Sequence, residues 1–498
     1  LPQDQVRVIG TLIGGGFGGK EDIMGQIHAA LLAQATDRPV KILYDRAESL
    51  LAHPKRHATV VRIKTGARRD GRLVAVQAEL VGDAGAYASL STKVLKRATT
   101  HATGPYDIPH AKVDCYAMYT NNPPAGAFRG FGVTQSAFAV ESNMDMLAHE
   151  LGMDPLELRR MNALRVGGTT ATGQVLRESV GLLDCIDWVE GRLASLSDEA
   201  SADVPGRRTG WGVAAAYKNT GMGGGAPDAA EAEVEVTPDG RAEVRISSAD
   251  LGQGLTTVLG QIAAEVFGLP FEQVHVLLSD TDLTPDGGPT TASRQTFVSG
   301  NAARHAAEKL RERMAGVAAE RWDCPPDGIR FEGGEVRAAP GPAEGSDDAA
   351  PFGQVVGWLI DEGHDPRLRY TYHAPETRPL GEGGDMHFAF GFSAQAAQVA
   401  VDPESGEVQV LRLVAAADGG RALNPQALLG QVEGGIVMGI GTALTEAYVL
   451  EEGIPQTRRW RDYDIPLIDD VPEMEIHLVE HPTSTGPYGA KGVGELPS

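Results

Sequence analysis

The stretch Gly486–Ser498, GPYGAKGVGELPS, places one carboxylate, Glu495, among four glycines. Glycine-rich backbone can approach a ligand closely and present its N–H groups, because no side chain stands in the way. A glutamate held in such a loop can serve as a general base. The alternative is a flexible terminus, since chain ends are poorly ordered by default. Earlier stretches of the same character favour the loop.

Five earlier stretches also combine glycines or small residues with a few polar side chains: Gly14–Gly19, Ala127–Gly132, Asp250–Gly254, Thr290–Gln295 and Gly430–Gly434. A glutamine amide both donates and accepts, as the edge of a heterocycle requires, and an arginine fork suits a carbonyl oxygen or carboxylate. Hydroxyls before a helix favour anions. Alone, each stretch is explained by a tight turn, a helix start, a cap or a surface arginine. Together they predict several loops that meet at one ligand.

The Gly14–Gly19 stretch formally satisfies the GxGxxG pattern of dinucleotide-binding folds. A strand-like run, Val6–Ile13, precedes it, and a helix-like run, Ile23–Ala35, follows. We do not favour that fold, because the chain continues in hairpins and the nearest candidate acid, Asp45, lies too late. A tight turn, or a loop that closely approaches a phosphate or pterin group, remains.

Composition limits the classes of function. A chain of 498 residues has room for two to four domains of roughly 100–200 residues. The net charge of -23 argues against nucleic-acid and anionic-membrane surfaces. The 3 cysteines lie far apart without metal-ligand spacing, which predicts a reducing, cytoplasmic location. No run approaches 18 apolar residues, so no membrane span is expected.

Hairpins interspersed with helices predict a mixed α+β fold. The hairpins are Ala58–Ala67 with Leu73–Gly82, and Glu231–Val236 with Ala242–Ile246, each across an Asp-Gly turn. Further strands are predicted at Val40–Leu43 and Val274–Leu278. Helices are predicted at Gln135–Leu151, Leu255–Phe267, Ala302–Glu320 and Ala427–Leu444. A shift in composition at Ser195–Arg208 predicts a boundary, with domains at residues 1–200 and 205–498.

Six motifs in order, IGGGFGGKE, AFRGFG, DLGQG, TTASRQ, GQVEG and GPYGAKGVGE, resemble the molybdenum-binding subunit of the xanthine dehydrogenase/aldehyde oxidase family. HPKRH (His53–His57), GDAGAYASL (Gly82–Leu90) and YTNNPPAGAFRGFGVTQ (Tyr119–Gln135) look most like the branch called selenium-dependent xanthine dehydrogenases. The resemblance implies two large molybdopterin-binding domains with the cofactor between them. The first, residues 1–200, has its N-terminal part apparently missing.

The resemblance also implies the cofactor. It is molybdenum on a pyranopterin dithiolene, usually the cytosine dinucleotide in bacteria, with a terminal sulfur or selenium and no direct ligand from the protein. The [2Fe–2S] clusters and FAD are implied on partner domains or subunits, because this chain lacks the cysteine pattern for clusters. Cofactor contacts are implied for Gly16, Phe17, Gly18, Gly252, Gln253, Gly254, Ala292, Ser293, Arg294 and Gln431.

By the same resemblance, Glu495 is the catalytic base, and Glu21 and Arg129 hold a purine. The implied reaction inserts water-derived oxygen at a carbon next to a ring nitrogen, and Arg129 stabilises the negative charge that grows on the ring oxygen. The alternatives are hydroxylation of another N-heterocycle such as nicotinate, oxidation of an aldehyde, and a non-catalytic structural subunit. An isolated NAD-binding protein is the least supported.

Two departures from the family pattern matter. The family's molybdenum portion begins upstream of the glycine-rich loop and carries another cofactor-contacting glutamine there. We therefore expect a cut piece or half of a split subunit, completed by a second chain. Purine enzymes also hold their substrate between two phenylalanines, and near one expected position this chain reads NTGMGGG, residues 219–225. The substrate therefore stays open.

Overall fold

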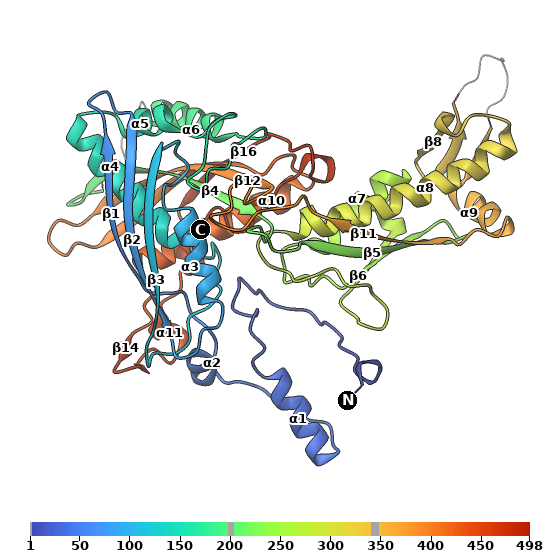
Figure 1. The fold of residues 1–498 in the computed structure, drawn as a ribbon, viewed down its shortest axis with the longest axis horizontal. Helices are drawn as coiled ribbons and strands as arrows, with labels where there is room; N and C mark the ends of the chain where they lie inside the picture. Colours follow the sequence, from blue (N-terminus) through green and yellow to red (C-terminus); the bar gives the residue numbers. More distant parts are fainter. Residues whose placement is uncertain (1, 198–203, 340–347) are drawn as a thin grey trace. The chain divides into compact units, whose positions relative to one another are not determined.

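The computed structural model describes residues 2–197, 204–339 and 348–498 (Figure 1). The chain forms two compact units, each built from three separate segments. Unit 1 comprises Leu1–Gly15, Thr220–Thr377 and Pro482–Gly492; unit 2 comprises Gly16–Asn219, Arg378–His481 and Val493–Ser498. The units interleave along the chain. The division into domains at residues 1–200 and 205–498 stays a prediction. Residues 198–203 of the expected boundary and 340–347 lie outside the described residues.

The first sheet of unit 2 has the order β1-β2-β3, formed by β1 (Thr59–Ala67), β2 (Leu73–Gly85) and β3 (His110–Tyr119). The predicted hairpin is confirmed: β1 and β2 are antiparallel across a turn in which Gly71 has a φ of +88°. The parallel strand β3 follows a crossover that contains α3 (Ser91–Thr100). A core of Leu73, Val76, Val140 and Met144 packs α4 (Val133–Leu151) against this sheet.

The second sheet of unit 2 has the order β16-β13-β12-β4, formed by β16 (Glu473–Val479), β13 (Val408–Asp418), β12 (Ala389–Val401) and β4 (Arg208–Thr220). Both of its faces are covered. Val414 and Ala416 pack toward α6 (Leu182–Ser197), whereas Leu413 and Ala415 pack toward α10 (Pro425–Leu444). This two-residue alternation is the side-chain period of a strand.

Helix α10 is 20 residues long, and an 18-residue window within it has a mean hydropathy of 1.4, so it is long and apolar enough to cross a membrane by length and composition alone. The sequence pattern predicts no such segment, because glycines, glutamines and Glu433 interrupt the apolar run. In unit 2, Val432 and Ile436 of α10 pack on β13, and 22% of the apolar window is buried.

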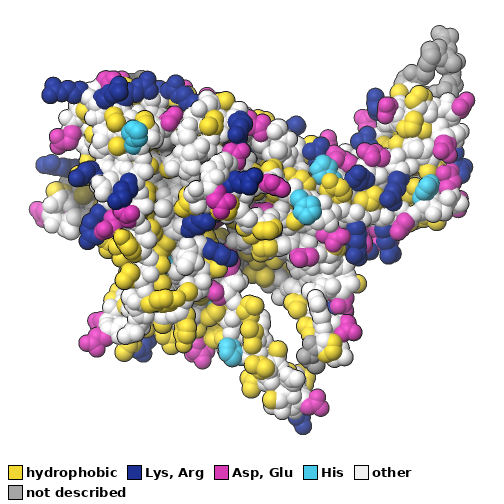
Figure 2. Space-filling view, viewed as in Figure 1, with side chains coloured by type: hydrophobic (Ala, Val, Ile, Leu, Met, Phe, Trp, Pro, Cys, Tyr) yellow, Lys and Arg dark blue, Asp and Glu magenta, His cyan; other side chains and the backbone are white. Residues whose placement is uncertain are grey.

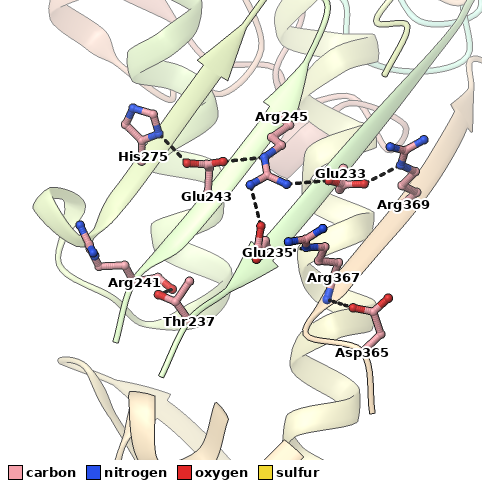
Figure 3. A network of polar contacts seen from close by, with 10 residues as sticks. All are labelled: Glu233, Glu235, Thr237, Arg241, Glu243, Arg245, His275, Asp365, Arg367 and Arg369. Atoms are coloured by element: carbon pink, nitrogen blue, oxygen red, sulfur yellow. Dashed lines mark hydrogen bonds and ion pairs between the residues drawn. The ribbon is translucent and has the colours of Figure 1, made fainter. Parts of the chain in front are cut away.

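Unit 1 is built on the sheet β11-β5-β6-β7, formed by β11 (Arg367–His373), β5 (Ala229–Val236), β6 (Ala242–Ile246) and β7 (Val274–Leu278). Its buried face, with Val234 and Val244, lies under α7 (Leu255–Phe267) and α8 (Gly300–Trp322). The other face carries a network of ion pairs around Arg245 (Figure 3). The network borders a hollow of about 440 Å³.

The remaining helices and strands are shorter or peripheral: α1 (Gln26–Thr36), α2 (Arg46–Ala52), α5 (Pro155–Asn162), β8 (Ile329–Glu332), β9 (Glu335–Ala338), β10 (Ala349–Pro351), α9 (Phe352–Asp361), β14 (Leu450–Glu451), β15 (Ile454–Pro455) and α11 (Trp460–Tyr463). Helix α5 begins as its sequence predicts. Asp154 accepts hydrogen bonds from the backbone N–H groups of Leu156 and Glu157, and Pro155 occupies the first helical position.

Two predicted strands, residues 6–13 and 40–43, are wrong. Residues 6–13 make only an isolated bridge between Ile9 and Asp280, and Leu12 is fully exposed. The bridge follows β7, whose pairing with β6 ends at Leu278. The apolar, β-branched composition of residues 6–13 therefore predicted a strand, but the segment with which these residues pair is too short to form one. Because no strand precedes the glycine loop, a dinucleotide-binding turn is not formed there.

A buried charge cluster joins four segments of unit 2. Glu141 on α4 accepts hydrogen bonds from Tyr106 Oη at 2.7 Å, Arg159 Nε at 2.8 Å and the backbone N–H of Ala215 at 2.8 Å. The Arg159 side chain is fully buried on α5. Removing one partner of a buried ion pair leaves an uncompensated charge.

We predict that Glu141→Ala lowers the free energy of unfolding by about 3–5 kcal/mol, because the fully buried Arg159 then keeps only Asp145, whose side chain is 47% exposed, as a charged partner. The matched control is Glu79→Ala, whose partner Arg62 is 69% exposed. Exposed pairs contribute under about 1 kcal/mol. Urea unfolding measures both, and equal losses would contradict the assigned role of Glu141.

Candidate functional site

Arg129 connects three of the predicted motifs within unit 2. Its side chain is buried, and its Nε donates to the carbonyl of Gly494 at 2.5 Å. Its Nη2 donates to the carbonyl of Gln431 on α10 at 2.7 Å. The guanidinium carbon lies 5.7 Å from the ring centroid of Phe17. One side chain therefore holds together the C-terminal segment, the GQVEG turn of α10 and the glycine loop.

The glycine loop packs closely on the AFRGFG segment. Gly18 has a φ of +97°, and a Cβ there would lie 2.8 Å from the carbonyl carbon of Ala127. Asp22 anchors the same loop by accepting a hydrogen bond from Ser89 Oγ at 2.8 Å. Phe17 has a left-handed φ of +51°, which costs energy for a residue with a Cβ. The loop is thus a strained, fixed turn.

Glu495 lies in a packed segment. Its neighbours Val493 and Leu496 are buried, so the last residues of the chain are not a loose tail. The Glu495 side chain is 14% exposed, and its Oε2 lies 3.1 Å from Nζ of Lys218 on β4. The Lys218 side chain is 3% exposed.

Three arginines add positive charge around this carboxylate. Burial lowers the pKa of Arg56, Arg97 and Arg129 to about 10 each, and the charge of Glu495 opposes this shift in all three. They come from three different segments: the chain before β1, α3 and the AFRGFG segment. All three remain cations near neutral pH. The carboxyl group of Glu495 therefore lies among four cations.

Unit 1 contains the DLGQG loop, which closes on itself. Asp250 accepts hydrogen bonds from the backbone of Gly252, Gly254 and Thr256, so it caps the start of α7. The Gln253 side chain accepts from the Leu251 N–H at 2.6 Å and donates to the Ala249 carbonyl at 3.1 Å. In this structure the loop's polar side chains fix its own conformation.

A second loop of unit 1 carries backbone strain. Ala292 and Ser293 both have left-handed φ angles, +51° and +50°. The Ala292 carbonyl accepts a hydrogen bond from the Gly221 N–H at 2.9 Å. Gly492 approaches so closely that a Cβ there would lie 2.2 Å from the Ser293 oxygen. Strained backbone of this kind persists where the surroundings hold it, and it clusters at ligand sites.

The buried side chain of Arg294 stabilises this loop. Its side chain is fully buried and pairs with Asp228 at 2.6 Å. It also donates to the carbonyls of Gly287, Pro289 and Ala229. The guanidinium thus fixes the conformation of the loop that carries Ala292 and Ser293.

The backbone of unit 1 fits a large polar cofactor. A Cβ at Gly14 or at Gly252 would meet no atom within 4 Å, so both positions present bare backbone with space around it. The two turns are joined, because the Gly15 N–H donates to the Leu251 carbonyl at 2.9 Å. Bare, joined glycine turns allow the close approach that phosphate and pterin groups need.

Sequence reasoning missed Lys218, Arg56 and Arg97. The signal for Lys218 was a charged residue in an otherwise apolar and small strand run, VAAAYKNT. Of the predicted residues, Phe17, Gly18, Arg129, Gln431 and Glu495 lie in one contact network of unit 2. Glu21 is exposed on the turn after Gly18, whose carbonyl accepts from the Glu21 N–H at 3.2 Å.

Comparison with known proteins identifies the class. Residues 1–163 and 183–472 match two family profiles, each described as a molybdopterin cofactor-binding domain. The chain is 31% identical over 505 residues to the xanthine dehydrogenase molybdenum-binding subunit of Escherichia coli O157:H7, and covers 65% of it. Over 187 residues, 38% of this chain and 44% of the relative, it is 51% identical to the nicotinate dehydrogenase large molybdopterin subunit of Eubacterium barkeri.

A solved structure agrees. Quinoline 2-oxidoreductase from Pseudomonas putida 86 matches with a TM-score of 0.88 and 30% identity over 99% of this chain and 64% of that one. The chain therefore belongs to the molybdopterin cofactor-binding domain family. Within it, the chain is a molybdenum-cofactor-binding member of the xanthine dehydrogenase/aldehyde oxidase family, with the predicted mixed fold.

The close approach of Gly18 to Ala127 gives a test of the site's construction. We predict that Gly18→Ala lowers the free energy of unfolding by at least about 1–2 kcal/mol, because a left-handed φ is unfavourable with a Cβ and the added atom meets backbone. Gly19→Ala is the control. Its Cβ would lie 3.5 Å from the Gly16 oxygen, an ordinary contact. If thermal unfolding shows equal losses of stability for the two variants, the assignment of the glycine loop as packed on the AFRGFG segment is wrong.

Proposed function

We propose that this chain is the catalytic, molybdenum-cofactor-binding part of a hydroxylase that acts on a purine such as xanthine or hypoxanthine. The observation that carries the proposal is Glu495, a carboxylate held by Lys218 and surrounded by Arg56, Arg97 and Arg129. A base fixed in positive surroundings suits a reaction in which negative charge grows on the substrate.

The proposed overall reaction balances as follows. Water supplies the oxygen, a C–H bond next to a ring nitrogen becomes C–OH, and two protons and two electrons leave. A bound molybdenum cofactor would supply the redox chemistry, and [2Fe–2S] clusters and FAD on partner domains or subunits would take up the electrons. Glu495 accepts one proton, and Arg129 helps to stabilise charge on the substrate oxygen.

We propose that the cofactor is molybdopterin cytosine dinucleotide, with a terminal sulfur or selenium on molybdenum. The backbone of residues 14–15, 251–254 and 292–293 supports cofactor contacts in unit 1, and Gly16, Phe17, Gly18 and Gln431 supply contacts from unit 2. The strained and bare turns described above support this assignment. Gln253 and Arg294 contribute by fixing those turns.

Hydroxylation of nicotinate or another N-heterocycle is the second candidate. The 187-residue match to a nicotinate dehydrogenase subunit favours it. The cations around Glu495 would suit the carboxylate of nicotinate as well as the oxygen of a purine. An uncharged aldehyde substrate would be stabilised less by this concentration of positive charge.

Partner polypeptides are part of the proposal. The chain spans 65% of the Escherichia coli relative. None of the residues of α1 is buried, and Ile27, Leu31 and Leu32 are each at least 50% exposed. Hydrophobic side chains follow this helix in Figure 2. We propose that a partner polypeptide, corresponding to the part of the relatives that this chain does not span, covers α1. The cytoplasmic location stays a prediction from the few cysteines.

We predict that Glu495→Gln abolishes turnover in the holoenzyme while molybdenum content stays unchanged, because the amide cannot accept the proton. Steady-state kinetics and elemental mass spectrometry on the same preparation measure the two quantities. Near-wild-type turnover would remove Glu495 as the base. A wild-type complex loaded with molybdenum but inactive on purines, N-heterocycles and aldehydes would favour the non-catalytic subunit.

Substrate class is tested at Glu21, since Arg129 also holds backbone and its replacement would perturb the site for every substrate. We predict that Glu21→Gln lowers kcat/KM for xanthine at least about tenfold, a typical effect of one lost charged hydrogen bond, and leaves aldehyde oxidation nearly unchanged. Lys20→Gln, a change at the neighbouring exposed charge, is the control. Equal losses on both substrate classes would contradict the purine assignment.

A further inference from the structure

Lys218 is a buried ammonium with defined acceptors. It lies on β4 with 3% of its side chain exposed. Its Nζ is 3.1 Å from Glu495 Oε2, 3.1 Å from Asn219 Oδ1 and 3.4 Å from the Asn219 carbonyl oxygen. An ammonium has three donors and no acceptor. The three acceptors therefore account for its full donor capacity, and Glu495 is the charged one.

The groups packed around this pair come from several elements. Three cations interact electrostatically with Glu495: Arg97 of α3, Arg129 before α4 and Arg56 before β1. His101 and His387 face Lys218, and burial holds the pKa of each well below its usual range, so both are neutral. Glu446 and Tyr463 face Arg56. Glu495 is thus the carboxylate that balances Lys218.

The lysine depends on this carboxylate. Burial lowers the pKa of Lys218, Arg97 lowers it further, and Glu495 opposes both. A buried charge is costly without a partner, and Glu495 is the charged acceptor of Lys218, so removing this carboxylate destabilises the buried ammonium.

We propose that Lys218 is a positioning residue for Glu495, which fixes one carboxylate oxygen and keeps the side chain ionised so that it can accept a proton. The catalytic half of this statement rests on the proposed function. Lys218 acts through Glu495 and touches no substrate. The competing explanation is an ion pair that only stabilises the C-terminal segment.

The first experiment measures coupling without activity. The variants Lys218→Met, Glu495→Gln and the double variant are compared by Tm in the purified complex. We expect Lys218→Met to lower the Tm, and Glu495→Gln to lower the Tm less in the Lys218→Met background than in wild type, because one of the cations that depend on Glu495 is then already absent. Lys55→Met is the control. Lys55 is also desolvated, with a pKa lowered to about 8, but it donates to the carbonyls of Ser49 and His53. The effect of Glu495→Gln on the Tm should be the same with Lys55 or Met at that position.

The second experiment measures ionisation. Infrared difference spectra between each protein and its Glu495→Gln counterpart isolate the carboxyl band of Glu495 during a pH titration. We expect the protonated band to appear at a pH at least about one unit higher in Lys218→Met than in wild type, and Lys218→Arg to stay near wild type. If Lys218→Met does not fold, Lys218→Gln keeps a hydrogen-bond donor without the charge.

Activity then separates the two claims. In an active holoenzyme, the acid limb of kcat should move upward with the infrared midpoint in Lys218→Met and stay in place in Lys218→Arg. Coupling in the Tm with an unshifted infrared midpoint would overturn the proposal and leave a structural ion pair. Loss of coupling between the two residues would also overturn it. An inactive wild type with coupling and a shifted midpoint would refute the proposed function and uphold Lys218 as the residue that keeps Glu495 ionised.

Discussion

The organisation of the site in unit 2 depends on the hydrogen bonds of one buried guanidinium. Arg129 donates to the carbonyls of Gly494 and Gln431, and its fork cannot be left without acceptors inside the protein. The carbonyl of Gly494 directly precedes Glu495 in the chain. Fixing it fixes where the carboxylate begins, and Phe17 on the other side of the guanidinium fixes the glycine loop. A mobile terminus thus becomes part of a rigid site.

Charge balance supplies the second constraint. Four buried or half-buried cations from four segments would repel one another without a common anion. Glu495 is that anion, so the residue that we propose as the base is also the one that balances the charge of its surroundings. Such an arrangement links stability to function, because any change that neutralises Glu495 alters the cost of every neighbouring cation. The excess of positive charge is what a substrate anion or oxyanion would meet.

Local features of the sequence predicted much of the fold. Helix α7 and strands β6 and β7 begin and end where the apolar pattern and the Asp-Gly turn place them, because these signals act within a few residues. Residues 6–13 failed, because a strand needs a neighbour and composition does not provide one. The interleaving of the two units was not predictable from local pattern, since it depends on pairing between distant strands such as β4 and β12.

The candidate site shows the same division. Composition alone was enough to identify the glycine motifs, and the resemblance to the xanthine dehydrogenase/aldehyde oxidase family suggested roles for Glu495, Arg129 and Glu21. Lys218 was missed because a lysine in a strand does not reveal which carboxylate, far along the chain, will neutralise it. The internal use of Arg294 was missed for the same reason, because its partners Asp228 and Ala229 lie on another segment. Sequence motifs indicate that a ligand is bound, whereas the three-dimensional structure determines which side chains are available to contact it.

The central claim is that these loops hold a molybdenum cofactor. Elemental mass spectrometry of the natively purified, fully assembled complex from molybdate-fed cells tests it most directly, with iron and selenium read in the same run. We expect about one molybdenum per copy of this chain together with co-purifying iron. A folded, complete complex without molybdenum would contradict it and would leave the glycine loops as architecture without their cofactor.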